Sequence, residues 1–486
     1  MKKNISIILA VCSLFILVGC ELMTSKTEMR HTYENRSVID SECGSNLFPH
    51  DETEPPCEGN GSPFDVDSTT NIIFHQWSWQ KFLWLTKPMQ DGTVLFENHL
   101  SLVDNNMMPV TPIDDVSLVL TDSTQADGGV LLSNPKYSTD DTSHTVYYSI
   151  HTNDILQDSA ELYKDQIIAE PSVVNNDFVF PVGSLELKIS WINENAIPEE
   201  KRSNYYIREA IVKGSKEQVA LLGMHVVGVV KNHPEFIWAT FEHAAFEDNG
   251  MAPQFSFSYP DQGNGYLYPV TSSNQKLFYK QGYRANNDDI TFNQSAPFKP
   301  QNVFTLFNYG VPKYTLGSPG SRGMFTKSSQ NEPVNYNNIK TLNTYVRNNL
   351  DGVWKNYFYN GSIWLDTDGM TEAAIAKKIT SLGNGIKNAS PGAMVRGSVA
   401  AFNITMETFF QSSAGDHLKY MPIKSVNNCF SCHTSITNIK LGAENYNKSN
   451  SPLYLSHIFR RFLSKSSNVS EENIEILRRE DLRRSF

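Results

Sequence analysis

The chain has 486 residues, of which 19% are charged and 11% are aromatic, and its formal net charge is −11 at pH 7. This balance is typical of a folded globular protein and excludes an intrinsically disordered one. The negative charge argues against nucleic acid as a partner, because phosphates would be repelled, and it favours a basic or neutral protein partner.

The first nineteen residues have the pattern of an export signal. Lys2 and Lys3 precede an apolar run over residues 5–18, which is shorter than the roughly 20 residues that a bilayer-spanning helix needs. The run ends in Leu-Val-Gly-Cys, which resembles a bacterial lipobox and implies cleavage before Cys20 and lipidation of that cysteine. An ordinary cleaved signal is the alternative. We therefore expect a lipid-anchored protein of the cell envelope that faces the periplasm, on the outer membrane rather than the inner one.

Residues 20–70 are polar and rich in proline and glycine, which predicts a tether without regular structure. Of the six cysteines, Cys12 leaves with the signal, Cys20 takes lipid, and two belong to a motif described below. Cys43 and Cys57 remain, and we expect them to form a disulfide, since disulfides persist outside the cytoplasm. Closing a loop of about 15 residues contributes roughly 3 kcal/mol in the chain-entropy description.

Residues 71–345 are expected to form a β-rich body. The aromatic stretch at residues 71–85 predicts a buried helix. Residues 183–191 alternate between apolar and polar side chains, and residues 219–230 and 236–243 are almost continuously apolar. These patterns predict adjacent antiparallel strands in a buried sheet.

The predicted sheet carries a candidate acid–base cluster. His225 lies within one apolar run, and Glu242 and His243 end the next. Glu186 and Lys188 point away from the apolar side of their strand. If these faces meet, titratable groups converge on a dry surface, where pKa values shift and catalysis becomes possible. A hydrogen-bonded polar cluster with a purely structural role is the alternative.

Residues 346–486 are expected to form a helical segment, and they contain a C-x-x-C-H motif at Cys429, Cys432 and His433. This is the attachment sequence of a c-type haem. Thiols three residues apart lie on one face of a helical turn and can each bond a haem vinyl group, while His433 binds the iron from the proximal side. A zinc site needs a second ligand pair, and the chain has no other C-x-x-C. A thioredoxin-like redox dithiol is expected beside a βαβ pattern, and no such pattern is visible around residue 429. We therefore predict one covalent haem c.

The sixth ligand of the iron is open to several residues. No methionine follows His433, so a methionine ligand must come from upstream, and Met421 and Met406 are the nearest. His457 is the single histidine downstream of the motif. Methionine raises the reduction potential relative to a second histidine. We favour an upstream methionine over His457 and keep an open sixth position as a further alternative.

Several other segments, taken together with the haem motif, form a pattern. They are residues 78–80, 183–191, 223–225, 237–243, 353–357 and 403–408. Together they resemble a poorly characterised family of exported bacterial cytochrome c-like proteins with one C-x-x-C-H near the C-terminus. The resemblance covers about residues 70 to 465 and implies export and a haem but no particular reaction. At residues 403–408 the usual Asn-Thr-Thr-Met-Glu-Thr is Asn-Ile-Thr-Met-Glu-Thr here.

The expected fold is α+β, with a β-rich central body, flanking helices and a C-terminal helical segment that binds haem. The expected function is one-electron transfer by a lipid-anchored monohaem c-type cytochrome with a redox partner protein. One alternative is a haem-dependent oxidoreductase or peroxidase with acid–base groups among His225, Glu242 and His243. Another is a haem-bearing sensor of a small molecule. An open sixth position favours these alternatives, and two strong axial ligands favour electron transfer.

Overall fold

The computed structural model describes residues 55–65, 71–123, 130–169, 178–244, 255–260, 271–273, 275–280, 283–286, 289–292, 301–305, 308–310, 332–381, 395–399, 401–407, 429–440 and 446–466. The signal peptide, Cys20, Cys43, Met421 and residues 467–486 of the expected helical segment lie outside them. Cys57 is disulfide-bonded, and the pairing with Cys43 stays a prediction. No described helix is long and apolar enough to cross a membrane.

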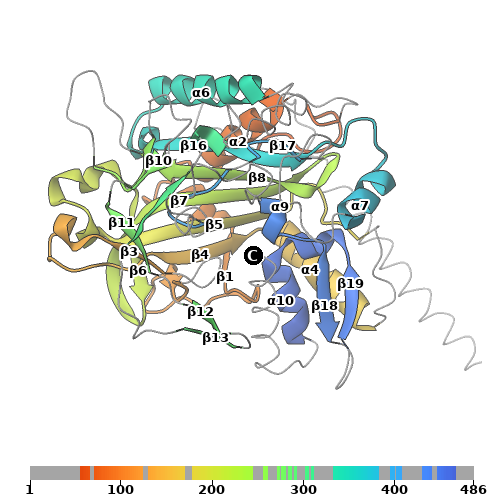
Figure 1. Ribbon diagram of the computed structural model, residues 1–486, viewed down its shortest axis with the longest axis horizontal. Helices are drawn as coiled ribbons and strands as arrows, with labels where there is room; N and C mark the ends of the chain where they lie inside the picture. Colours follow the sequence, from red (N-terminus) through yellow and green to blue (C-terminus); the bar gives the residue numbers. More distant parts are fainter. Residues whose placement is uncertain are drawn as a thin grey trace, which may run out of the picture.

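A large sheet organises the described part of the molecule (Figure 1). Its nine strands are β1 (Ser101–Val103), β2 (Val119–Leu120), β4 (Tyr147–Thr152), β5 (Leu185–Asn193), β6 (Ile207–Val212), β7 (Ser215–Val230), β8 (His233–His243), β16 (Tyr357–Leu365) and β17 (Val395–Gly397). They run in the order β1-β4-β5-β7-β8-β16-β17, and β6 pairs with β7 and β2. The pairing is antiparallel except between β2 and β6. This confirms the expected α+β fold with a β-rich body.

The predicted strands at residues 183–191, 219–230 and 236–243 correspond to β5, β7 and β8. A two-residue turn joins β7 to β8, and Asn232 in this turn has a φ of 65°. Asparagine tolerates this left-handed conformation better than most residues do. The turn fixes the register between the two strands, which in turn decides which side chains face the haem motif.

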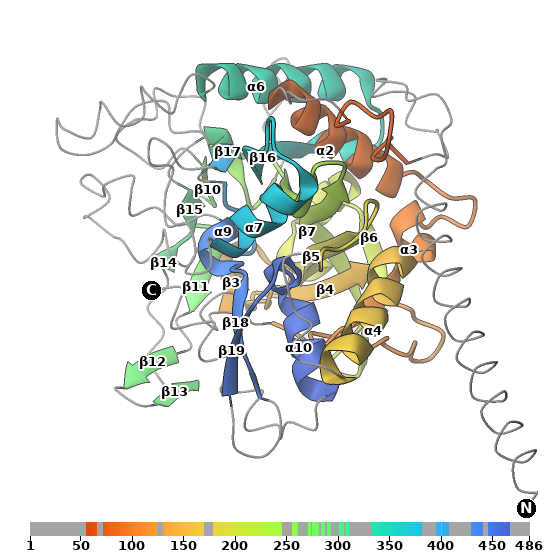
Figure 2. The same ribbon diagram turned by 90° about the vertical axis from the view of Figure 1, so that its right-hand side faces the viewer.

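Helices cover both faces of the sheet. One face carries α2 (Asn71–Leu85) and α6 (Glu332–Asn349), which lie together at the top of Figures 1 and 2. The other face carries α4 (Asp154–Ala169), α7 (Glu372–Ser381) and α10 (His457–Ser466). The short helices α3 (Leu95–His99) and α9 (Cys429–Cys432) complete the described set. Figure 2 shows α10 beside α4, with α9 above both of them and next to α7.

Smaller sheets flank the central one. They comprise β3 (Val130–Ser133), β11 (Leu277–Lys280) and β14 (Gln301–Asn302); β9 (Tyr259–Pro260), β10 (Thr271–Ser272) and β15 (Phe304–Thr305); β12 (Tyr283–Asn286) with β13 (Asp289–Phe292); and β18 (Ile436–Lys440) with β19 (Tyr446–Asn450). The β18–β19 hairpin separates α9 from α10, so the segment around the motif is mixed rather than purely helical.

The expected boundary between residues 345 and 346 falls inside α6. Beyond it, β16 pairs with β8 and β17 pairs with β16, so both strands continue the central sheet. The helical segment expected from residue 346 onward continues α6 only to Asn349, and Tyr357 begins the strand β16. The motif-bearing segment is therefore packed on the body and is continuous with its sheet.

Candidate functional site

The haem motif forms a single helical turn, α9, at Cys429–Cys432. The backbone N–H of His433 donates to the carbonyl oxygen of Cys429 at 2.8 Å and continues the turn. Neither cysteine forms a disulfide bond, and both are half-buried. Burial raises the pKa of the Cys429 thiol, and the carboxylate of Glu407 raises it further. Both thiols are thus held in the spacing that haem attachment requires.

The imidazole of His433 is oriented by a backbone carbonyl. Its Nδ1 donates to the carbonyl oxygen of Leu455 at 2.7 Å, which places the proton on Nδ1 and leaves the lone pair on Nε2. Nε2 has no hydrogen bond within the described part of the chain. Burial lowers the pKa of His433 to about 3, so the ring is neutral at neutral pH. Metal-binding histidines commonly have this arrangement, with one ring N–H bonded to a carbonyl and the other nitrogen available.

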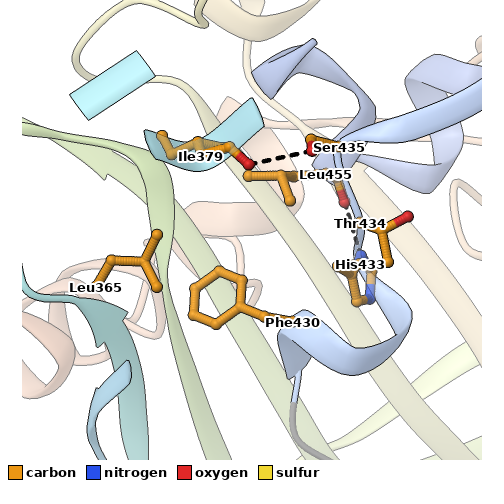
Figure 3. A pocket seen from close by; sticks show the side chains of 7 residues that line it. All are labelled: Leu365, Ile379, Phe430, His433, Thr434, Ser435 and Leu455. Atoms are coloured by element: carbon orange, nitrogen blue, oxygen red, sulfur yellow. Dashed lines mark hydrogen bonds between the residues drawn. The ribbon is translucent and has the colours of Figure 1, made fainter. Parts of the chain in front are cut away.

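A small cavity lies beside His433 (Figure 3). It has a volume of about 10 Å³ and is lined by Leu365, Ile379, Phe430, His433, Thr434, Ser435 and Leu455. The lining is mostly apolar, and the hydroxyl of Ser435 is occupied because it donates to the carbonyl oxygen of Ile379 at 3.1 Å. A volume of about 10 Å³ is roughly what one water molecule needs, so apolar side chains pack closely beside the histidine.

The sheet beneath the motif presents a first row of side chains, Trp238, Val227 and Glu186. Val227 pairs with Trp238 on one side and with Glu186 on the other, so all three project from the same face. The ring centroid of Trp238 lies 4.2 Å from that of His433. Ser456 Oγ donates to Oε2 of Glu186 at 3.0 Å. These contacts seat the motif directly on this row.

A second row lies on the same face, two residues further along each strand. His225 pairs with Lys188 in register, and Nε2 of His225 lies 2.5 Å from Oε1 of Glu407. Burial opposes ionisation of Glu407, but His225, a backbone N–H and Lys188 together hold its pKa below the ordinary value. Burial lowers the pKa of Lys188. Lys188 and His225 also contribute to the lowered pKa of His433, which puts this row within electrostatic range of the motif.

The three candidate acid–base residues are divided between the faces of the sheet. Glu242 projects from the same face as His225, because it lies two residues after Thr240, the partner of His225. His243 projects from the opposite face, where its ring stacks on Tyr205 at 3.7 Å. Consecutive strand residues alternate in direction. The structure therefore does not bring His243 to the motif.

Glu242 is wholly buried and lies among hydrogen-bond donors. Its Oε2 accepts from Ser258 Oγ at 2.7 Å, and its Oε1 accepts from Asn360 Nδ2 at 3.1 Å and from the N–H of Ile404 at 3.3 Å. Burial raises the pKa of Glu242 to about 8 despite these bonds. At neutral pH this carboxyl is mainly protonated, and it ties the segment at residues 401–407 to the sheet.

That segment contributes the functional residue that sequence reasoning missed, Glu407. Asn403 Nδ2 donates to the carbonyl oxygen of Phe241 at 3.0 Å, and the hydroxyls of Thr405 and Ser190 lie 2.6 Å apart. These bonds fix the segment across the sheet and bring Glu407 to His225. The signal in the sequence was the shared pattern at residues 403–408, which gave no individual role to Glu407.

The structure separates the candidates for the sixth ligand. Met406 is buried in a cluster with Tyr148 and Phe255, which is distinct from the cluster that contains Phe430 of the motif. The ring of His457 stacks face to face on His433, with centroids 4.0 Å apart and planes 17° apart. Two histidines that bind one iron from opposite sides each direct a ring nitrogen at the iron along the plane of the ring. Rings stacked face to face do not have that arrangement. Met421 lies outside the described residues.

The described part of the motif offers a helical turn with two thiols, an imidazole whose Nε2 makes no hydrogen bond among the described residues, and an apolar wall, which are the groups that would hold a covalent haem. Within the described ranges, no group of three or more His, Cys, Asp or Glu side chains is arranged to hold a bare metal ion. No protein-family model matches the chain, and no curated protein or solved structure is similar to it. The resemblance to exported cytochrome c-like proteins therefore rests on the sequence segments alone and stays a prediction.

Proposed function

We propose that the protein is a monohaem c-type cytochrome, anchored by lipid at Cys20 and facing the periplasm, that transfers single electrons. The observation that carries this proposal is the C-x-x-C-H turn in which Nδ1 of His433 is bonded to the carbonyl of Leu455 and Nε2 is left as a ligand. The acidic chain favours a redox partner protein with a basic or neutral surface.

Each residue of the site has a separate role in this proposal. Cys429 and Cys432 each add a thiol S–H across a haem vinyl group, which gives two thioether bonds. His433 binds the iron through Nε2, and its bond to Leu455 fixes the tautomer and makes the imidazole a stronger donor. When bound, the haem supplies the one-electron Fe(III)/Fe(II) couple. Phe430 and the apolar cavity wall exclude water from the proximal side, which is one way a protein sets the potential.

Haem attachment tests the proposal directly. The chain is produced in a host that attaches haem c, and the purified protein is extracted with acid acetone and assayed as a pyridine haemochrome. We expect the wild type to retain its haem and a Cys429→Ser, Cys432→Ser variant to lose it. Cys57→Ser is the matched control, since it removes a cysteine outside the motif and should leave the haem in place. Extraction of the haem from the wild type would overturn the proposal.

The anchor and the disulfide are tested on the same protein. Mass spectrometry of the mature chain should find lipid on Cys20 and a bond between Cys43 and Cys57. A free thiol at Cys20 contradicts the anchor. Alkylation of Cys43 without a reductant contradicts the disulfide.

A haem-dependent oxidoreductase or peroxidase is the second candidate function, and the His225–Glu407 pair favours it. An imidazole 2.5 Å from a carboxylate, with Lys188 on the same face, is suited to proton transfer beside a redox group. Carbon monoxide discriminates the two functions. A carrier with two strong axial ligands binds it slowly or not at all in the reduced state, whereas rapid binding favours the enzyme.

A further inference from the structure

Three aromatic rings form a stack at the haem motif. The imidazole of His433 lies between the indole of Trp238, at 4.2 Å between centroids, and the imidazole of His457, at 4.0 Å. The rings of His433 and His457 are nearly parallel, at 17°, whereas Trp238 is tilted by 49°. The imidazole of His433 therefore has two aromatic neighbours, one stacked on it and one tilted against it.

Trp238 is held by the sheet. It lies in β8, and its Nε1 donates to the carbonyl oxygen of Glu235 at 3.0 Å. Its ring also meets Phe430 of the motif edge-on, at 6.3 Å, and Phe236 at 6.0 Å. Because its polar atom is satisfied and its ring is packed, the indole is a fixed surface against which His433 rests.

His457 is held by the motif itself. It is the first residue of α10, and its Nε2 donates to the carbonyl oxygen of Cys432 at 3.2 Å. The preceding residue, Ser456, is bonded to Glu186 of the sheet. The same short stretch supplies the Leu455 carbonyl that accepts from His433. One segment thus provides both a hydrogen bond and a stacking partner for the proximal imidazole.

We propose that Trp238 and His457 are positioning residues that set the plane of the His433 ring, and that His457 belongs to the proximal side of the haem. This inference rests on the proposed function. Rotation of an imidazole about its Cβ–Cγ bond is broad and poorly restrained by itself. One hydrogen bond to Leu455 directs Nε2 but leaves the ring free to rotate about that bond, and the ring contacts with Trp238 and His457 restrict this rotation. The stacked geometry is the reason to remove His457 from the candidates for the sixth ligand.

The experiment uses the holoprotein with paired substitutions at each position. Trp238→Phe and His457→Phe keep an aromatic ring but cannot ligate iron, whereas Trp238→Ala and His457→Ala remove the ring. Haem content is measured first by pyridine haemochrome. Electron paramagnetic resonance of the oxidised haem then reports the orientation of the axial imidazole, and the reduced spectrum with and without carbon monoxide reports whether the sixth position is occupied.

We expect the Phe variants to keep the wild-type resonance and carbon monoxide behaviour. The Ala variants should broaden or shift the resonance. They should also weaken the hold of His433 on the iron about tenfold, which is at the lower end of the usual effect of losing an outer-shell partner; displacement by added imidazole measures this change. Trp79→Ala is the matched control, because Trp79 is a buried tryptophan on the opposite face of the same sheet. It should lower stability without changing the resonance.

Two results would overturn the inference while the haem content is normal. If His457→Phe opens the iron to rapid carbon monoxide binding that the wild type does not show, His457 is the sixth ligand. If both Ala variants keep the wild-type resonance and imidazole affinity, the stack does not position His433. A wild type without covalent haem instead refutes the proposed function, and the haemochrome assay separates that case from the other two.

Discussion

The two faces of the central sheet are built from the same strands but differ in chemistry. On the face covered by α2 and α6, Leu187, Met224 and Val226 pack against tryptophan and phenylalanine side chains. The residues between them, Lys188 and His225, project from the face that carries the haem motif. Because consecutive residues of a strand point to opposite faces, the same strands carry a dry core on one face and charged side chains on the other. Substitutions on the two faces should therefore have different readouts.

Removing a large side chain from the α2 face should have the largest effect on stability. Trp79 is fully buried, and its ring contacts Phe82 and Phe241. Trp79→Ala should lower the free energy of unfolding by about 3–5 kcal/mol, through lost burial and the cavity left behind. Denaturant titration measures the loss. At low denaturant the visible spectrum of the haem should not change; a changed spectrum would mean that the faces are coupled.

The motif face should lose stability as the pH rises, through Glu242. Its folded-state pKa of about 8 is raised above the ordinary value of 4.5, chiefly by burial. The stability that protonated Glu242 contributes is therefore fully present below the ordinary pKa, and it is lost as the pH rises through the folded-state pKa. Glu242→Gln keeps the neutral shape and can still accept from Asn360 and Ile404. Each pKa unit is worth about 1.4 kcal/mol, so the variant should gain roughly 3–4 kcal/mol over the wild type between about pH 5 and pH 8.

The matched control for Glu242→Gln is Glu372→Gln, which removes a carboxylate that is paired with Lys231 at the surface. This variant should follow the wild-type dependence of unfolding free energy on pH. If the unfolding free energy of Glu242→Gln also depends on pH as that of the wild type does, Glu242 is ionised in the folded protein and the expected direction of its pKa shift is incorrect.

The α2 face should respond to pH in the opposite direction, through His75. Burial lowers the pKa of His75 to about 4 from an ordinary 6.5, with Asn335 opposing the shift. The neutral ring contributes fully above the ordinary pKa, and this stability is lost as the pH falls toward the folded value. His75→Gln should reduce the acid loss by roughly 2–3 kcal/mol. Urea titrations across this range measure it, with His144→Gln in a surface loop as the control; equal acid sensitivity in wild type and His75→Gln would contradict the assignment.

Patterning in the sequence predicted the elements whose burial is one-sided or continuous. The helix at α2 and the strands β5, β7 and β8 were found because apolar spacing follows their geometry. β16 was missed, since it is buried on both faces and interrupted by Asn360 and Gly361, so no alternation remains. α4 was also missed, although Leu156, Ala160 and Ile167 recur at helical spacing and line one buried side.

The candidate site was predictable where covalent chemistry fixes the spacing and where strand alternation assigns a face, as it does for His225, Glu186 and Lys188. Cys429, Cys432 and His433 were identified because haem attachment requires that order of residues. The Leu455 carbonyl, the Trp238 ring and the Glu407 carboxylate come from segments that meet only after folding. His457 was one candidate for the sixth ligand because of its residue type, with an upstream methionine favoured over it, whereas the ring stack depends on the packing of α10. Long-range packing has no local signal in a single sequence.

Two glycines of β7 provide the smallest and most closely matched comparison of the faces. A Cβ on Gly223 would lie 2.7 Å from the side chains of Asn403 and Thr405, on the motif face. A Cβ on Gly228 would lie 2.8 Å from the ring of Trp77, on the α2 face. Both distances are shorter than van der Waals contact, so Ala at either position should cost roughly 1–3 kcal/mol through forced displacement.

The two variants should differ at the proposed haem. Gly223→Ala pushes on the segment that holds Glu407 against His225, so it should alter the haem potential or spectrum as well as stability. Gly228→Ala displaces a tryptophan of α2 and should lower stability alone. Spectroelectrochemistry of the two proteins at equal folded fraction makes the comparison. If Gly223→Ala leaves the potential unchanged, the segment at residues 401–407 braces the sheet without influence on the haem. If Gly228→Ala shifts the potential equally, strain crosses the sheet and the two faces do not act separately.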